Sequence, residues 1–517
     1  MNGLNQALAY IILFVCALPE VILLVCALGI LVVDMYLPPK RRAVTWLLSL
    51  AAIVFCAVSV FYPFLVSEVI HTFGGMFVSD PLSRMLKLCT CLAMFVTLVY
   101  SRRYIDERGM TGGFIGGEFY VLALFSMLGQ MIVISGVNFL VLYLGIELMS
   151  LPLYALTAMR RNDVRVSEAA IKYFILGMLG SGFLLYGISM LYGATGSLDF
   201  AGILKVCASG NVNETVLVFG VVFVVAGMAF KLGVAPFHMW VPDVYEGAPS
   251  SVTLLIGGLP KLAAFALFFR VLVEGMWPLA ISWQQMLIVM AVLSMATGNI
   301  IALRQTNLKR MLAYSGIAHG GFILLGMLSG VFDGATLQHS ADAWSAALFY
   351  TVAYVLVFSG AFGVMLAMAR AGFEAELLDD MRGLNKRSPW LAFMMLLFML
   401  SMTGLPPLIG FYAKLSVLEA VVGAGRIWLA VIAIVLAVIG AFYYLNVVRL
   451  MYFDAPPDSG KIVMPGEVRV MLVLNGLAVL LLGIFPGSLM SWCESVIYRV
   501  LSHSLSEGVI ISVLSYS

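Results

Sequence analysis

The chain has 517 residues, of which 62% are hydrophobic and only 11% are charged. A soluble domain usually carries about 25% charged residues. These proportions exclude a soluble enzyme, a nucleic-acid-binding protein and a disordered protein. The net charge of +2 is also too small to indicate a polyanionic partner.

Apolar runs long enough to cross a bilayer recur along the whole sequence. The first run lacks a preceding basic segment and spans about 25 residues, which is typical of a retained span rather than a cleaved signal peptide. The predicted fold is an all-α polytopic membrane protein with fourteen transmembrane helices and a short tail at 498–517. The predicted spans are 9–34, 43–66, 83–101, 118–135, 138–159, 167–192, 215–240, 251–273, 281–303, 310–331, 343–369, 390–423, 428–452 and 468–495.

The basic residues are concentrated in alternate loops. The positive-inside rule places the rich loops in the cytoplasm and both termini on the opposite, periplasmic side. The other loops and ends carry few basic residues, such as Lys205, Arg426 and Arg499. The rich loops and adjoining helix ends hold 19 of the 29 basic residues: Lys40, Arg41, Arg42, Arg102, Arg103, Arg108, Arg160, Arg161, Arg165, Arg304, Lys309, Arg310, Arg370, Arg382, Lys386, Arg387, Arg449, Lys461 and Arg469.

Two predicted spans contain a glycine followed three residues later by a proline. Gly233 precedes Pro236 in the span 215–240, and Gly404 precedes Pro407 in the span 390–423. Proline removes a backbone donor and clashes with the preceding turn, so each helix should break there. Freed backbone groups are tolerated in a membrane only inside protein or beside a water-filled cavity.

The second broken helix is the fifth span after the first, and this odd offset means that it should be inverted relative to the first. Inverted repeats with discontinuous helices are typical of transport proteins whose site lies near the bilayer midplane; the alternative is two unrelated proline kinks. The predicted organisation is one membrane domain: three N-terminal helices (1–110), a first repeat (118–273), a second, inverted repeat (281–452) and a last helix (468–495).

Four of the ionisable residues inside predicted spans stand out, because charge is costly there and indicates a functional site. Glu147 and Lys261 are in mid-span. Lys231 directly precedes the first break, and Lys414 follows the second break by about two turns. The alternative is that Glu147 and a lysine only hold helices together, but a static pair would not need two further lysines.

Proton transfer fits these residue types. A lysine in a low-dielectric environment can lose its proton near neutral pH, and a nearby carboxylate favours the charged form. Movement of the carboxylate would therefore load or unload the lysine. We predict that Glu147, Lys231, Lys261 and Lys414 form a proton path connected by water at the broken helices.

Three further residues are secondary candidates. Lys172 stands about one turn inside its span. At that depth, a lysine that only extends its ammonium to the membrane interface is an equally good interpretation. His238 could pass protons at the cytoplasmic end of the first break. His319 is intramembrane and could belong to the path, although a hydrogen-bonded core histidine is the more common case. Glu20, in the first span, has no evident partner.

Redox and metal chemistry are not indicated in this chain. The seven cysteines include no C-x-x-C, and no second pair or nearby histidine completes a metal site at Cys89 and Cys91. No two histidines stand at facing mid-span positions, as haem ligands would. The pairs Gly112-Gly113 and Gly116-Gly117 follow no predicted strand, so phosphate binding there is poorly supported.

Four motifs resemble the antiporter-like membrane subunits of respiratory complex I. These are Tyr143-Leu-Gly-Ile-Glu-Leu-Met-Ser-Leu-Pro152, Ala229-Phe-Lys-Leu-Gly-Val-Ala-Pro-Phe-His-Met-Trp240, Val241-Pro-Asp-Val-Tyr-Glu-Gly-Ala-Pro249 and Leu308-Lys-Arg-Met-Leu-Ala-Tyr-Ser315. The resemblance extends over nearly all the predicted helices, and the combined length of the motifs makes it specific.

Three features narrow the resemblance within this family. Leu18-Pro-Glu-Val-Ile22 resembles the start of one subunit type, and Lys414 stands where a second type has a glutamate. A third type continues into a long lateral helix, whereas this sequence ends about 20 residues after its last predicted span. The first type is therefore expected.

The resemblance implies roles for individual residues. Glu147 matches the family's glutamate that pairs with the central lysine, and Lys231 matches that proton-loading lysine. Lys261 matches the bridging lysine of the next helix, and Lys414 the terminal lysine. Lys172 and His238 match positions thought to modulate or feed the path.

The resemblance also implies that the chain is part of an enzyme, the proton-translocating NADH:quinone oxidoreductase of the bacterial inner membrane. It would carry proton transfer, whereas NADH, FMN, iron–sulfur clusters and quinone would be used by other parts of the complex. No cofactor or metal is expected on this chain, and its partners would be other membrane subunits in a hetero-oligomer.

Three rival functions remain open from the sequence. The first is a subunit of a multi-subunit sodium/proton antiporter, which shares the fold. The second is a quinone-binding or purely structural membrane subunit. The third is a stand-alone solute carrier, which would transport without partners.

Overall fold

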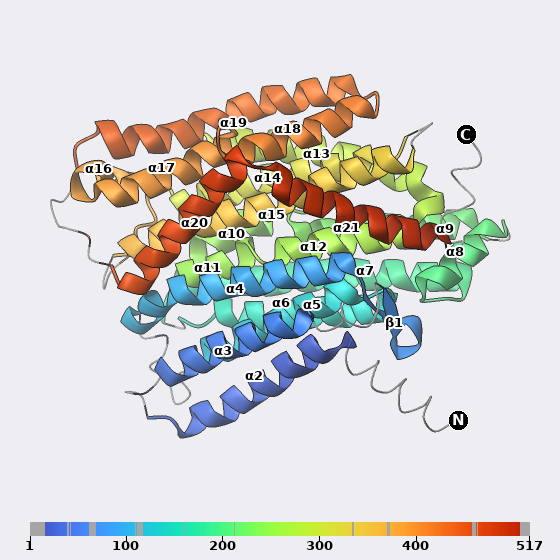
Figure 1. Cartoon of the computed structure of the whole chain (residues 1–517), viewed down its shortest axis with the longest axis horizontal. Helices are drawn as coiled ribbons and strands as arrows, with labels where there is room; N and C mark the ends of the chain where they lie inside the picture. Colours follow the sequence, from blue (N-terminus) through green and yellow to red (C-terminus); the bar gives the residue numbers. More distant parts are fainter. Residues whose placement is uncertain are drawn as a thin grey trace.

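The computed structural model describes residues 16–38, 41, 43–61, 69–108, 110, 117–160, 162–210, 212–332, 336–369, 373–456, 462 and 464–506. Nearly all of these residues lie in helices that run side by side between two ends of the molecule (Figure 1). The predicted all-α membrane fold is confirmed. Residues 9–15 of the predicted span 9–34 and residues 507–517 of the predicted tail lie outside the described residues.

Thirteen helical segments of the described part are long and apolar enough to cross a membrane. The span predicted at 390–423 is present as two shorter helices, α17 and α18, so the total of fourteen remains a prediction. Twelve of these segments are built on single long helices: α2 (Leu18–Tyr36), α3 (Ala43–Val60), α4 (Pro81–Glu107), α5 (Glu118–Ser135), α6 (Phe139–Thr157), α7 (Val164–Thr195), α9 (Glu214–Leu232), α13 (Ala280–Ala302), α14 (Leu308–Ser329), α15 (Leu337–Met368), α19 (Ile427–Phe453) and α20 (Gly466–Ile484). The thirteenth is the segment Ser250–Gly275, whereas the long helix α21 (Gly487–Ser506) is not among them.

Shorter elements connect or interrupt these helices. A small antiparallel hairpin, β1 (Ile70–Thr72) and β2 (Phe77–Ser79), lies beside the start of α4 and was not predicted. The short helices are α8 (Phe200–Ala208), α10 (Trp240–Gly247), α11 (Ser250–Gly257), α12 (Pro260–Phe268), α16 (Leu384–Arg387), α17 (Pro389–Thr403) and α18 (Ile409–Gly423).

Two predicted spans are divided where the sequence analysis expected continuous helices. The span 251–273 is interrupted between α11 and α12, because the Gly258 backbone is distorted (φ −97°, ψ −75°) and Pro260 has no N–H to continue the ladder. The span 468–495 was wrong as a single helix: α20 ends at Ile484 and α21 begins at Gly487, with Pro486 between them. Both interruptions coincide with a proline that the apolar pattern alone did not weigh.

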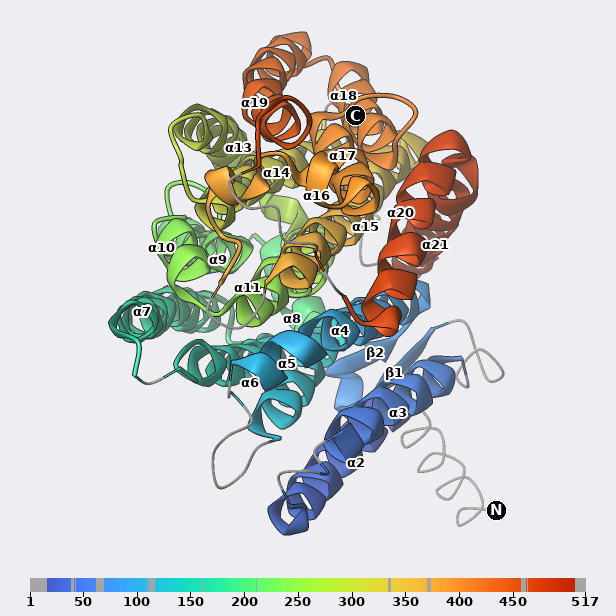
Figure 2. The same ribbon diagram turned by 90° about the vertical axis from the view of Figure 1, so that its left-hand side faces the viewer.

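The centre of the molecule is formed by helices that are apolar on every side. The segment Ser250–Gly275 and α14 are buried throughout, and α15 is almost as deeply covered. In Figure 2, which looks at the helices nearly end-on, the α2–α3 hairpin lies at one edge and α18 and α19 lie at the opposite edge. Outer helices keep exposed apolar faces, which a bilayer or a partner can cover.

The loops predicted to be rich in basic residues gather at one end of the molecule, on the left in Figure 1. Ion pairs join segments there that are far apart in sequence, including Arg102 with Glu467 (3.1 Å) and Lys309 with Glu376 (3.0 Å). Glu374 accepts from Arg160 at 2.7 Å. Lys40, Arg42, Arg161, Arg370 and Lys461 lie outside the described residues.

At the opposite end of the molecule lie the start of the first described long helix and the end of the last one. α2 begins there and α21 ends there (Figure 1). A buried cation that the sequence analysis did not weigh, Arg270, also lies toward this end. It is paired with Asp80 (2.8 Å) and Glu274 (2.8 Å).

Glu20 has a partner after all. Its carboxylate lies 2.7 Å from the Lys87 ammonium of α4, and the two side chains are only 8% and 2% exposed. A buried charge without its counterion is far more costly than an exposed one. This pair therefore fixes α2 against α4.

We expect Lys87→Met to lower the free energy of unfolding by about 3–5 kcal/mol, because the Glu20 carboxylate would stay buried without a cation. Arg103→Met is the matched control, because Arg103 forms a partly exposed pair with Glu107 that is worth under about 1 kcal/mol. The measurement is the thermal denaturation midpoint of the chain in its native membrane assembly. The double variant Glu20→Gln/Lys87→Met should recover much of the loss. Equal midpoints for Lys87→Met and Arg103→Met would contradict the anchoring role.

Candidate functional site at two broken helices

The first predicted break is present where α9 ends. Gly233 adopts a left-handed conformation (φ 72°), which ends the helix, and α10 begins seven residues later at Trp240. The carbonyls left free at the end of α9 receive side-chain donors. Lys261 Nζ donates to the Leu232 carbonyl, and Trp240 Nε1 donates to the Phe230 carbonyl at 3.1 Å.

A backbone donor freed by the same break is also satisfied. The Ala235 N–H donates to Ser294 Oγ at 2.8 Å, and both groups are buried. Ser294 belongs to α13, which lies in the predicted second repeat. The first break is therefore held by side chains from its own half and from the other half of the chain.

The second break repeats this arrangement. α17 ends at Gly404, again in a left-handed conformation (φ 87°), and α18 begins at Ile409. Lys414 Nζ donates to the carbonyls of Met402 (2.9 Å) and Thr403 (2.8 Å). Lys261 and Lys414 thus make equivalent contacts, because each ammonium caps the carbonyl end of a half-helix, although Lys261 belongs to α12 and Lys414 to α18, the second half of its own broken span.

The two broken helices run in opposite directions. In Figure 1, α9 runs from the right-hand end toward the middle, whereas α17 starts at the left-hand end, where the basic loops lie. The predicted inversion is confirmed. Carbonyl ends of half-helices carry partial negative charge, which favours a cation beside them.

Lys231 is in the last turn of α9 and is half-buried. Its Nζ donates to Ser150 Oγ of α6 at 3.0 Å and to Ser181 Oγ of α7 at 3.3 Å. Glu147 lies one turn before Ser150 on α6, and its Oε1 is buried without a hydrogen-bond partner. Glu147 and Lys231 therefore share a neighbourhood but form no direct ion pair, which differs from the expected pairing.

His319 is buried in α14 within a hydroxyl network. Its Nδ1 lies 2.6 Å from Tyr350 Oη and its Nε2 lies 3.1 Å from Tyr444 Oη. Tyr444 is also 2.5 Å from Ser315 Oγ. A cavity of about 20 Å³ connects His319 with Met402 of the second break, which is room for roughly one water molecule.

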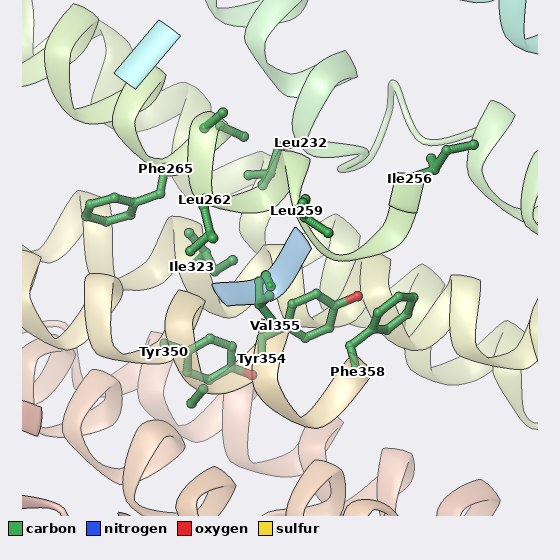
Figure 3. Close-up of a cluster of buried hydrophobic side chains, with 14 of the residues drawn as sticks. Leu232, Ile256, Leu259, Leu262, Phe265, Ile323, Tyr350, Tyr354, Val355 and Phe358 are labelled. Carbon is green, nitrogen blue, oxygen red and sulfur yellow. The ribbon is translucent and has the colours of Figure 1, made fainter. Parts of the chain in front are cut away.

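An apolar layer separates the first break from this network. Figure 3 shows Leu232, Leu259 and Leu262 packed against side chains of α14 and α15. The facing side chains include Ile323 and Val355, with Tyr350 on the side of His319. Tyr354 belongs to the same cluster; its ring lies 5.2 Å from the His319 ring and its hydroxyl is buried without a hydrogen-bond partner. The layer is therefore apolar except for its tyrosine hydroxyls.

Lys172 lies at the surface and away from Lys231. Its Nζ is 2.9 Å from Asp243 and 2.8 Å from Glu168, and Arg310 pairs with Asp243 at 2.8 Å. Burial by itself would raise the pKa of Asp243, but the hydrogen bonds from Lys172 and Arg310 outweigh it and lower that pKa. Asp243 thus stays ionised at neutral pH and ties α7, α10 and α14 together.

His238 lies in the first break and is half-buried. Its Nδ1 is buried without a hydrogen-bond partner. The structure therefore brings Glu147, Lys231, Lys261 and His238 to the first break, and His319 and Lys414 to the second. Lys172 belongs to the charged surface network instead.

The hydroxyl partners at these sites were not found from the sequence. In the sequence, nothing distinguishes Ser150, Ser181 and Ser294 from the other serines of the apolar runs. Most buried hydroxyls in membrane helices bond to their own helix, as Thr90 does to the Leu86 carbonyl. Only the packing of neighbouring helices shows which serines face a break.

Inverted discontinuous helices with cations at their ends define a membrane transport protein. The model of the family described as NADH:quinone oxidoreductase/Mrp antiporter, TM, matches residues 136–440. The NADH-quinone oxidoreductase subunit N of Herminiimonas arsenicoxydans is 56% identical over 97% of this chain and all of its own length. The chain belongs to this family.

Solved structures agree with this assignment. A chain of respiratory complex I from Thermus thermophilus with bound aureothin matches with a TM-score of 0.75 and 30% identity, over 92% of this chain and 98% of its own. A chain of the Mrp complex from Dietzia sp. DQ12-45-1b matches with a TM-score of 0.79 at 20% identity, over 95% and 97%. The second likeness shows the fold alone.

Ser294→Ala should weaken the first break by about 1–3 kcal/mol, because the buried Ala235 N–H would lose its acceptor. The control is Ser329→Ala, because Ser329 Oγ donates only to the Leu325 carbonyl of its own helix. Amide hydrogen exchange of the segment 233–237, measured in the native assembly, should accelerate in Ser294→Ala alone. Ser294→Thr keeps the hydroxyl and should retain much of the protection. Unchanged exchange in Ser294→Ala would show that this bond does not hold the break.

Proposed function

We propose that this chain is a proton-translocating membrane subunit of a bacterial NADH:quinone oxidoreductase, of the type called subunit N in its relatives. Relatives with that name are at least 50% identical over most of the chain. The observation that carries the proposal is the matched pair of ammonium groups, Lys261 and Lys414, at the ends of two oppositely directed half-helices. A static scaffold would not require a cation at both breaks.

Protons are taken up at Lys231, pass through Lys261 and His319, and leave through Lys414. Each transfer moves a proton between a lysine or histidine and a hydroxyl or water within hydrogen-bond reach. Ser150 and Ser181 serve Lys231, and Tyr350 and Tyr444 serve His319. Glu147 sets the charge balance at Lys231, because an unpaired carboxylate nearby favours the ammonium form.

His238 and Lys172 support uptake rather than carry the central transfer. His238 lies in the break between Lys231 and the charged end of the molecule. Lys172 acts through Asp243, which it helps to hold against α10. The apolar layer shown in Figure 3 must become hydrated for a proton to pass from the first half to the second.

Quinone reduction elsewhere in the complex supplies the driving force. NADH, FMN, iron–sulfur clusters and quinone are used by other subunits, and this chain binds none of them. Its partners are the other membrane subunits and the bilayer. The segments 118–273 and 281–452 act as two half-channels beside the N-terminal segment 1–110.

A subunit of a multi-subunit sodium/proton antiporter is the second candidate. It is favoured by the shared family and by the fold likeness to the Mrp complex chain. The chain is only 20% identical to that Mrp chain but 56% identical to an oxidoreductase subunit, so the oxidoreductase remains the first candidate. Co-purification with redox subunits would decide for the oxidoreductase.

We expect Lys231→Met to reduce NADH-driven proton pumping about tenfold or more, because the loading group is lost. Lys231→Arg keeps the charge but rarely releases a proton, so it should also pump poorly. The control is Lys205→Met, at an exposed position of α8. Pumping and quinone reductase activity are measured together in membrane vesicles. Full pumping by Lys231→Met with normal quinone reduction would refute its role.

The basic end of the molecule faces the cytoplasm, which places both termini in the periplasm. We expect a membrane-impermeant thiol reagent to label Lys205→Cys in right-side-out vesicles and Arg382→Cys in inside-out vesicles. The unsubstituted chain supplies the background of its seven cysteines. The reverse labelling pattern would invert the orientation and the direction of transport.

A further inference from the structure

A charged cavity of about 480 Å³ opens at the end of the molecule that carries the basic loops. Its inner wall includes Ala169 and Lys172 of α7, and Asp243 and Gly247 of α10. These positions are on the two helices that lead from the surface toward Lys231. The cavity is therefore a large polar space on that side of the proposed loading site.

A stack of two aromatic rings stands directly behind this wall. Tyr173 is one helical turn inward from Ala169, and Trp240 is one turn from Asp243. Their rings are 4.8 Å apart and nearly parallel, with an interplanar angle of 16°. They are only 6% and 5% exposed, so both rings are buried in this state.

Two further rings connect the stack to the surroundings of Lys231. Phe230, the residue before Lys231, lies 5.4 Å from Trp240, which also donates its indole N–H to the Phe230 carbonyl. Tyr154 packs against Tyr173 at 4.6 Å. Tyr154 lies one turn from Ser150, the hydroxyl that accepts from Lys231 Nζ. The four rings thus form an aromatic layer between the charged cavity and Lys231.

Glycines on α7 allow this layer to close. A Cβ at Gly177 would overlap the Tyr154 hydroxyl, and a Cβ at Gly180 would overlap the Phe230 ring. Because neither glycine has a side chain, the rings reach the α7 backbone and leave no gap. The layer is built by close packing across α6, α7, α9 and α10.

We propose that the Tyr173–Trp240 stack is the gate on the water route from the charged cavity to Lys231. A proton needs a chain of waters or hydroxyls. The stacked faces of the Tyr173 and Trp240 rings supply neither, because a tyrosine hydroxyl stands at the edge of its ring and not between two stacked faces. The indole N–H is occupied by the Phe230 carbonyl, so it offers no free donor to the cavity. Loading of Lys231 therefore requires Trp240 to move away from Tyr173. This inference rests on the proposed function, because that function makes Lys231 the group to be loaded.

The test measures access directly with a cysteine behind the gate. Ser150→Cys is nearly isosteric and lies on the Lys231 side of the layer. The whole complex is kept in inside-out membrane vesicles and treated with a cationic, membrane-impermeant methanethiosulfonate. Labelling of the unsubstituted chain, with its seven cysteines, is subtracted as background.

Removal of the indole should open the route. Trp240→Ala should accelerate labelling of the cysteine at position 150 about tenfold or more, because the thiol becomes reachable from the cavity. Trp240→Phe keeps a ring in the stack and should change the rate little. Trp344→Ala is the matched control: Trp344 is also buried, donates to a helix carbonyl at 3.0 Å and contacts another ring, but belongs to α15.

Equal labelling rates in Trp240→Ala and Trp344→Ala would overturn the gate, as would faster labelling only from right-side-out vesicles. If the complex with Trp240→Ala does not assemble, the labelling rates with Trp240→Leu and with Tyr173→Leu are compared with the rate for Trp344→Ala instead. The labelling rate is independent of pumping. Faster labelling combined with normal pumping by Lys231→Met would keep the gate and reject the proposed loading role.

Discussion

The structure depends on one constraint, which is that backbone groups freed inside a membrane must find partners within the protein. Each broken helix releases carbonyls at one end and N–H groups beyond it. The carbonyls of Leu232 and Thr403 accept hydrogen bonds from lysine ammonium groups, and the Ala235 N–H donates to a serine hydroxyl. The cations therefore stabilise the breaks as well as offering protons, so a change of charge at a lysine also changes how its break is held.

The same cost of isolated charge explains the other buried ions. Glu20 is paired with Lys87, and Arg270 with Asp80 and Glu274. These pairs lie away from the two Gly–Pro breaks, although Arg270 belongs to the segment interrupted between α11 and α12. By contrast, Lys231 donates to two neutral serines while the Glu147 Oε1 stays without a hydrogen bond. The buried charges that hold helices together form direct ion pairs. Glu147 and Lys231, near the first break, form no direct ion pair, so their contacts can change. Apolar and aromatic layers on either side keep that region apart from the surface and from the second half.

Much of the fold could be predicted because its determinants are local. The length of the apolar runs predicts the spans, and the alternation of basic loops predicts the direction in which each span crosses the membrane. The spacing of glycine and proline predicts the breaks at 233–236 and 404–407. The interruptions at Gly258 and Pro486 were missed because the surrounding sequence is uniformly apolar. The partner of Glu20 was missed because Lys87 belongs to a helix more than sixty residues later. Lys172 was placed near the path by resemblance, but its surface ion pairs are formed with α10.

The sequence by itself determined the membrane class, the broken helices and the short set of intramembrane lysines. Hydropathy, proline and glycine act within a few residues, so they can be evaluated without a partner. Only the tertiary structure decided that Lys261 caps α9, that Ser294 accepts from the first break, and that Trp240 stacks on Tyr173. The central helices are apolar on every side, so no stripe indicates which face packs against which neighbour. That choice is made when the helices pack together, and it places the hydroxyls, rings and cations of the site.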